Sequence, residues 1–153
     1  MDIQLGLPRD QAISALRQRD YCRENIPVRN KERYDSCHRP GARTNESWIV
    51  ARYEKGFLHL LQRFERYAKP ELATQRWHDL VTSRTERDGQ PSQEARERLL
   101  EIRGLPRGTI SWAAWFTRDP GVLVGVYRLH QDGDKDPNII EELRPDPDRW
   151  RQQ

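Results

Sequence analysis

Two segments of the chain show a strand–turn–strand pattern, which restricts the fold more than any other feature. Residues 48–67 are rich in aromatic and β-branched residues on both sides of a turn at Gly56. In residues 109–130, Ile110, Trp112, Ala114 and Phe116 occupy every second position, and the segment turns at Gly121. Runs of this composition around glycine-containing turns are typical of β-hairpins. The sequence therefore predicts two antiparallel hairpins.

Three further segments are predicted to be helices. In residues 70–87, Pro70 suits a first helical turn, and the apolar residues recur on one helical face. Residues 8–18 carry a shorter stripe of the same period. Residues 92–103 begin at a capping serine and end before Gly104 and Pro106. The stripe of the long helix consists of Leu72, Ala73, Trp77, Leu80 and Val81.

These elements predict an α+β domain with two layers, in which about three helices pack on one face of an antiparallel sheet made from the two hairpins. The domain is expected to span residues 1–130. Residues 131–153 are rich in Asp, Pro and Arg and are expected to form an extended or flexible C-terminal tail. Hydrophobic residues make up 35% of the chain and charged residues 33%, so the core must be small.

The cysteines Cys22 and Cys37 lie in a polar stretch, residues 19–47, that is expected to be a loop or an irregular hairpin. A disulfide closing a loop of about 15 residues removes about 3 kcal/mol of freedom from the unfolded chain. Such a bond would place the protein in an oxidising compartment such as a bacterial periplasm. Two reduced thiols in a cytoplasmic protein are the alternative.

Four side chains are predicted to form a partner-binding patch. Trp and Arg are the residues most often found at binding hot spots. Trp115 stands near Arg118 on one hairpin, and Trp48 stands near Arg52 on the other. Trp112 and Trp115 are three positions apart on a strand, so they point to opposite faces. The alternative is that the protein's own helices and tail cover both faces.

The charge pattern leaves two kinds of partner open. The formal net charge is +3, and nearly all the basic residues are Arg, which binds carboxylates and phosphates in a planar, bidentate manner. Another protein with an acidic surface is the favoured partner. Nucleic acid is the alternative partner, but an excess of basic residues alone does not establish nucleic-acid binding. No membrane span is expected, and the oligomeric state is left open.

No metal or cofactor site is predicted. His38 follows Cys37, but the other histidines are single and the chain lacks the paired spacing that begins a zinc site. The acidic run at Asp132 starts like a calcium loop, yet Pro137 and Leu143 stand where a glycine and a glutamate are needed.

No nucleophile elbow or glycine-rich phosphate loop occurs either. A ribonuclease-like centre from His59, His78 and Arg76 has no support in the spacing. The chain is therefore expected not to be an enzyme, with a small hydrolase or nuclease as a further alternative.

The N-terminal segment Ile3-x-Leu5-Gly6-Leu7-Pro8, followed by Ile13 and Leu16, resembles the start of small bacterial envelope modules of the BamE/SmpA type. β-Lactamase-inhibitor-like domains share that architecture. Pro8 replaces the usual hydroxyl cap, and the resemblance covers about fifteen residues. It implies a periplasmic, non-catalytic module whose sheet binds another protein, with an inhibitor or immunity role as one form of it.

Overall fold

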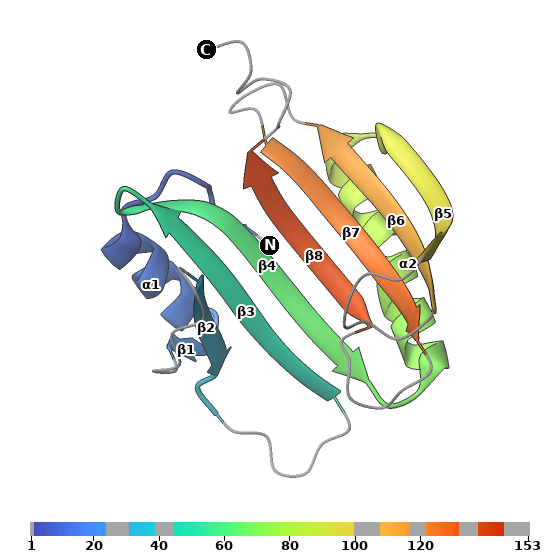
Figure 1. Cartoon of the computed structure of the whole chain (residues 1–153), viewed down its shortest axis with the longest axis horizontal. Helices are drawn as coiled ribbons and strands as arrows, with labels where there is room; N and C mark the ends of the chain where they lie inside the picture. The colour runs from blue at the N-terminus through green and yellow to red at the C-terminus, as the bar shows by residue number, and fades with distance from the viewer. Residues whose placement is uncertain are drawn as a thin grey trace.

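The computed structural model describes residues 2–23, 31–38, 45–99, 108–116, 122–131 and 138–145. Two helices and eight strands lie in these ranges (Figure 1). They are α1 (Arg9–Arg17), β1 (Tyr21–Arg23), β2 (Lys31–Ser36), β3 (Asn45–Glu54), β4 (Phe57–Tyr67), α2 (Pro70–Asp88), β5 (Gln93–Leu99), β6 (Gly108–Phe116), β7 (Val122–Gln131) and β8 (Ile139–Pro145).

All eight strands form one antiparallel sheet in the order β1-β2-β3-β4-β8-β7-β6-β5. The α+β class and the antiparallel sheet are thus confirmed. A helix followed by four strands occurs twice along the chain, and the last strand of each unit, β4 and β8, meets the other at the centre of the sheet. Within the described residues, the same order of elements therefore occurs twice.

The prediction of a helix at residues 92–103 is wrong, because Gln93–Leu99 form strand β5. The segment contains Glu, Arg, Ala and Leu, all good helix formers, so its local preference favours a helix. Pairing with β6 along the full length of β5 overrides that preference. Residues 100–103 lie outside the part of the chain that the structure describes.

The C-terminal tail expected from residue 131 contains a central strand. Ile139–Pro145 form β8, which pairs with β4 on one side and with β7 on the other. Ile139 and Leu143 are buried there, at 1% and 4% exposure. The seven residues of β8 lie within a very polar segment. The burial of Ile139 and Leu143 therefore follows from strand pairing on both sides of β8 and not from the composition of the segment.

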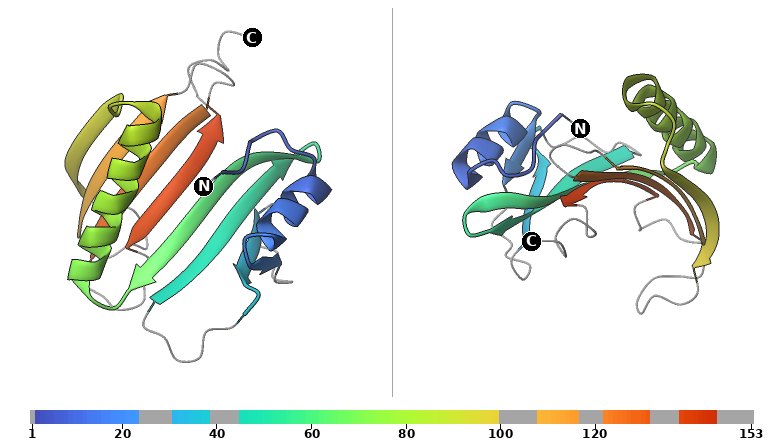
Figure 2. Two further views of the ribbon diagram at one scale, coloured as in Figure 1. Left: turned by 180° about the vertical axis from the view of Figure 1, so that it is seen from behind. Right: turned by 90° about the horizontal axis from the view of Figure 1, so that it is seen from above.

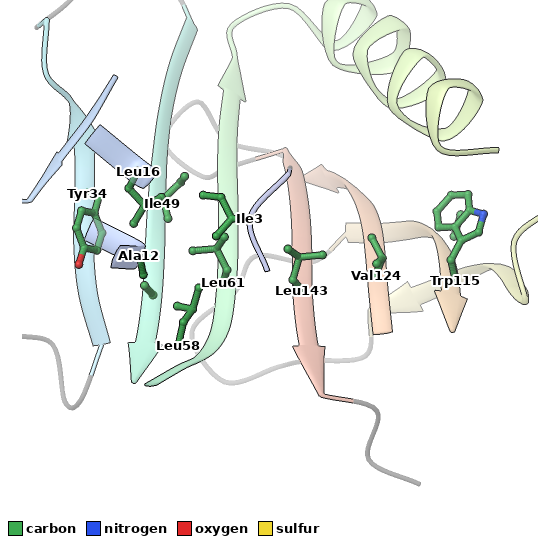
Figure 3. Packing of buried hydrophobic residues seen from close by; sticks show 12 residues of the cluster. Ile3, Ala12, Leu16, Tyr34, Ile49, Leu58, Leu61, Trp115, Val124 and Leu143 are labelled. Atoms are coloured by element: carbon green, nitrogen blue, oxygen red, sulfur yellow. The ribbon is translucent and has the colours of Figure 1, made fainter. Parts of the chain in front are cut away.

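Both helices lie on the same face of the sheet (Figure 2). The core fills the layer between them and the strands, and Figure 3 shows it as a row of side chains running from Tyr34 on β2 to Trp115 on β6. The N-terminal segment joins this layer through Ile3, which is 5% exposed. The fully buried large side chains are Leu16, Tyr34, Ile49, Leu58, Leu61 and Ile139.

A β-bulge changes the alternation of β4. The pairing of β3 with β4 shifts between Arg52 and Tyr53, so that these residues pair with Leu60 and Leu58 and His59 is the extra residue. A bulge inserts one residue and thereby turns the following side chains to the other face. Leu58 and Leu61 consequently both reach the core. Leu58 therefore does not share a face with Leu60 and Phe64, contrary to the simple alternation of the sequence.

Candidate binding face of the sheet

The register of the strands divides the side chains of the sheet between two faces. On β3, Ile49 and Ala51 are buried in the layer beneath the helices. Because neighbouring residues of a strand point to opposite sides, Trp48, Val50 and Arg52 lie on the other face of the sheet. We call this side, which faces away from α1 and α2, the opposite face.

Trp48 is the centre of a cluster of stacked side chains on the opposite face. Its ring stacks on Phe64 of β4, with 5.5 Å between the ring centroids and an interplanar angle of 10°. The guanidinium groups of Arg33 and Arg66 lie 5.1 and 5.6 Å from the Trp48 ring centroid. We call these four residues the Trp48 cluster. Stacking and cation–π contacts of this kind hold an aromatic ring in one orientation.

Two copies of the tripeptide Glu-Arg-Tyr build this cluster. Glu32-Arg33-Tyr34 lies on β2 and Glu65-Arg66-Tyr67 lies on β4, the two strands that flank β3. In each copy the tyrosine hydroxyl donates to the glutamate two residues before it, at 2.6 and 2.7 Å. In each copy the arginine between them points to the opposite face and lies over Trp48.

The glutamates of the two tripeptides bind the helices. Arg9 of α1 donates from Nε and Nη2 to Glu32, at 3.0 and 2.7 Å. Arg76 of α2 donates from the same two nitrogens to Glu65, at 2.9 Å each. Each tripeptide therefore fastens a helix on one side of the sheet and the Trp48 ring on the other.

The pKa values of the two glutamates reflect these contacts. Burial of Glu65 raises its pKa, but the hydrogen bond from Arg76 and the charges of Arg63 and Arg76 outweigh burial, so the pKa lies below its ordinary value. Burial likewise raises the pKa of Glu32, and hydrogen bonds from Tyr34 and Arg9 bring it below the ordinary value. Both carboxylates are therefore charged near neutral pH.

An apolar row continues from the Trp48 cluster across the sheet. Phe64 is directly opposite Ile140 on β8 in the strand register. Ile140 is opposite Tyr127, and Tyr127 is opposite Trp112 on β6. Trp48, Phe64, Ile140 and Trp112 are all half-buried. We call these four residues the apolar row; it reaches from the first four-stranded unit into the second.

Ion pairs flank the part of the apolar row that lies on β3, β4 and β8. Arg33 pairs with Asp35 at 2.8 Å, and Arg66 pairs with Glu46 at 3.1 Å. Two further pairs on this face are Arg52–Glu54 and Arg144–Glu142, at 2.5 and 3.4 Å. The buried Glu142 also accepts a hydrogen bond from Gln62 at 2.5 Å. Each of these four arginines is thus balanced by a carboxylate on its own face.

Of the four predicted partner-binding residues, Trp48 and Arg52 lie on the opposite face. Trp115 does not, because it is 2% exposed in the core and its indole N–H donates to the carbonyl oxygen of Gly89 at 2.9 Å. Alternation along β6 places Trp112, not Trp115, on the opposite face. Arg118 lies outside the described residues. The Glu-Arg-Tyr repeat, which the sequence contains twice, is the signal that could have identified Arg33 and Arg66.

The residues considered for a ribonuclease-like centre have other roles. Arg76 is held by Glu65 in the layer beneath α2. His59 lies 3.4 Å from Glu54 at the bulge, and His78 makes an edge contact with Trp77 on α2. In the described part of the chain, no group of three or more His, Cys, Asp or Glu side chains is placed to hold a metal ion.

The predicted disulfide between Cys22 and Cys37 is present. Cys22 belongs to β1, and Cys37 follows β2 and donates its backbone N–H to the carbonyl oxygen of Asp20 at 2.8 Å. Ser36 and His38 also bind Asp20 through their side chains. The bond thus lies at the edge of the sheet.

No family model, curated protein or solved structure matches the chain. Among the described residues, no helix is long and apolar enough to cross a membrane.

Proposed function

We propose that the chain is a non-catalytic protein-binding module that binds its partner through the opposite face. The observation that carries this proposal is the apolar row with the Trp48 cluster at one end. Large aromatic side chains held rigidly lose little conformational freedom on binding, and Trp and Arg are the residues that most often dominate interface energies. A central apolar strip within a polar rim is also the usual anatomy of a protein interface.

The ion pairs favour a protein over a nucleic acid. Binding to a nucleic acid draws most of its affinity from arginines and lysines that neutralise phosphates. On the opposite face, Arg33, Arg52, Arg66 and Arg144 are already paired with carboxylates. A partner protein can meet such a rim with charges of both signs. We therefore propose a mixed-charge partner surface instead of the purely acidic one expected from the net charge.

The disulfide and the N-terminal resemblance support a location in the bacterial envelope. Disulfides persist in oxidising compartments such as the periplasm. The resemblance of the first residues to BamE/SmpA-type modules points to the same compartment. Within this proposal, the module acts as an inhibitor or immunity protein, because a broad preformed face that covers a partner's surface blocks access to it.

The experiment is an affinity capture from an extract of the organism that encodes the chain. The bait is the wild-type protein, Trp48→Ala, Trp112→Ala or the control Leu72→Ala. Leu72 is 45% exposed on α2 and so lies on the helical side of the sheet. We expect one protein to be captured in stoichiometric amount by wild type and by the control, and to be lost with both tryptophan variants.

Two results would contradict the proposal. Equal capture by all four baits would exclude the opposite face as the binding surface. Loss of the captured material after nuclease treatment would favour the nucleic-acid alternative. The inhibitory role has a separate test: if the captured protein is an enzyme, its activity should fall to a low plateau at one equivalent of the module, and full activity at saturation would remove that role.

A further inference from the structure

The disulfide lies beside only one of the two Glu-Arg-Tyr tripeptides. In the strand register, Cys22 is opposite Asp35, and Asp35 is opposite Trp48. Asp35 accepts a hydrogen bond from Nε of Arg33 at 2.8 Å, and Arg33 lies over the Trp48 ring. Three successive contacts thus join the disulfide to the Trp48 cluster.

The two tripeptides differ in what flanks them. Glu65-Arg66-Tyr67 lies on β4, between β3 and β8. Glu32-Arg33-Tyr34 lies on β2, whose outer neighbour is β1, a strand of three residues at the edge of the sheet. On the β8 side of the first copy, Glu65 pairs with Ile139, and the Asn138 side chain hydrogen-bonds the backbone of Tyr67. The second copy has a short edge strand on its outer side, and the disulfide is the covalent bond that fixes this strand.

We propose that the Cys22–Cys37 disulfide controls the binding face by redox chemistry, so that its reduction loosens Arg33 and alters the packing of the Trp48 ring, which Phe64 and Arg66 continue to contact. This inference rests on the proposed protein-binding function. A dithiol reductant supplies two electrons and two protons: one of its thiolates attacks a sulfur of the bond, and its second thiol resolves the mixed disulfide. The chain is left with two thiols, and the reductant becomes a disulfide. Both cysteines are half-buried rather than enclosed in the core.

The change is local because other contacts hold β1 in place. Arg23 of β1 pairs with Glu32 at 3.5 Å, and the Tyr21 hydroxyl bonds the Ser47 hydroxyl at 2.7 Å. These contacts lie on the helical side of the sheet and do not involve the cysteines. The contacts of Ser36, Cys37 and His38 with Asp20 also remain. Reduction should therefore remove only the covalent restraint beside the Asp35–Arg33 pair, while the core layer remains intact.

The test uses the full chain labelled with fluorotryptophan, which gives one fluorine NMR signal for each of its five tryptophans. Single Trp→Phe substitutions assign the signals. On addition of dithiothreitol, we expect the Trp48 signal to shift or broaden and those of Trp77, Trp112 and Trp115 to stay. The double variant Cys22→Ser/Cys37→Ser should show the reduced Trp48 signal with or without dithiothreitol.

An unchanged Trp48 signal would overturn the inference, and so would a joint shift of all the signals, because the bond would then only maintain the fold. Affinity capture with oxidised and reduced bait separates the two proposals. Loss of capture on reduction supports redox control. Equal capture in both states overturns redox control and leaves the binding function standing, whereas capture in neither state overturns both.

Discussion

The helices α1 and α2 cover the same face of one sheet, but they are attached to it by different means. α1 has nine residues, and its inward side chains Ala12 and Leu16 are fully buried. α2 has nineteen residues, yet Ala73 is its only fully buried apolar side chain, while Trp77 and Leu80 are half-buried. A short helix can thus be held by a few well-buried groups, whereas the long one depends on contacts supplied from the sheet.

One of those contacts is an ion pair and another comes from an aromatic side chain. Glu65 of β4 binds Arg76 of α2, and within the sheet Arg63 of β4 pairs with Glu141 of β8 at 2.5 Å. At the end of α2, Trp115 rises from β6 and donates to the carbonyl oxygen of Gly89. On the α1 side, the corresponding Arg9–Glu32 pair adds to a helix that is already buried. The comparison therefore predicts different sensitive residues on the two sides.

Trp115→Ala should have the largest effect on the free energy of unfolding, because it removes a contact that holds α2 on the sheet. Removing a buried Trp costs about 4 kcal/mol from the lost burial and the cavity left behind. Urea unfolding followed by circular dichroism measures this change. Trp48→Ala is the matched control, because Trp48 is half-buried on the opposite face, and it should cost about 1 kcal/mol. Equal losses for the two variants would contradict the division of the sheet into a core face and a binding face.

Leu16→Ala should have the next largest effect on the free energy of unfolding, because it removes a buried contact that holds α1 on the sheet. A Leu that is fully buried costs about 3 kcal/mol when truncated to Ala. The same substitution at Leu80, which is half-buried on α2, should cost about 1 kcal/mol. Urea midpoints of the two variants give the comparison. If Leu80→Ala were the more damaging, apolar packing would be the main attachment of α2 after all.

Glu65→Gln and Glu32→Gln compare the two tripeptides directly. The side chain of Glu65 is 9% exposed, and its loss of charge removes the ion pair with Arg76, so we expect a cost of about 2 kcal/mol. The side chain of Glu32 is 20% exposed, so solvent compensates its arginine better and about 1 kcal/mol is expected. The free energies of unfolding at neutral pH measure both values, and the reverse order would mean that the α1 pair carries more of the stability.

The parts of this fold that the sequence predicts are those whose local pattern and tertiary environment agree. The long helix was expected at residues 70–87 and is found at Pro70–Asp88. The disulfide was expected because a polar stretch with two cysteines has little else to hold it. For these two features, the local sequence pattern can be interpreted without knowing which distant segments pack against it.

The elements that the sequence does not predict are fixed by distant partners. β5 is a strand because β6 pairs with it, although its residues favour a helix. β8 is a strand at the centre of the sheet because it pairs with β4 on one side and with β7 on the other. The site follows the same rule. Trp115, predicted to bind a partner, is buried in the core, and Trp112 lies on the opposite face. Alternation shows that they face opposite ways, but only the position of α2 decides which of them is buried.

Acid should weaken the protein through both tripeptides, more strongly on the α2 side. The pKa values of Glu65 and Glu32 lie below 4.5 in the folded protein, so their stabilising contribution is complete above that pH and is lost as the pH falls through the folded values. Urea unfolding from neutral pH down to a pH of about 3 should show a falling free energy of unfolding for the wild type. Glu65→Gln should flatten this slope, and Glu32→Gln should flatten it less, because Glu32 is the more exposed carboxylate. A slope that is identical in the wild type and in Glu65→Gln would show that other carboxylates cause the acid sensitivity and that the α2 attachment does not depend on the charge of Glu65.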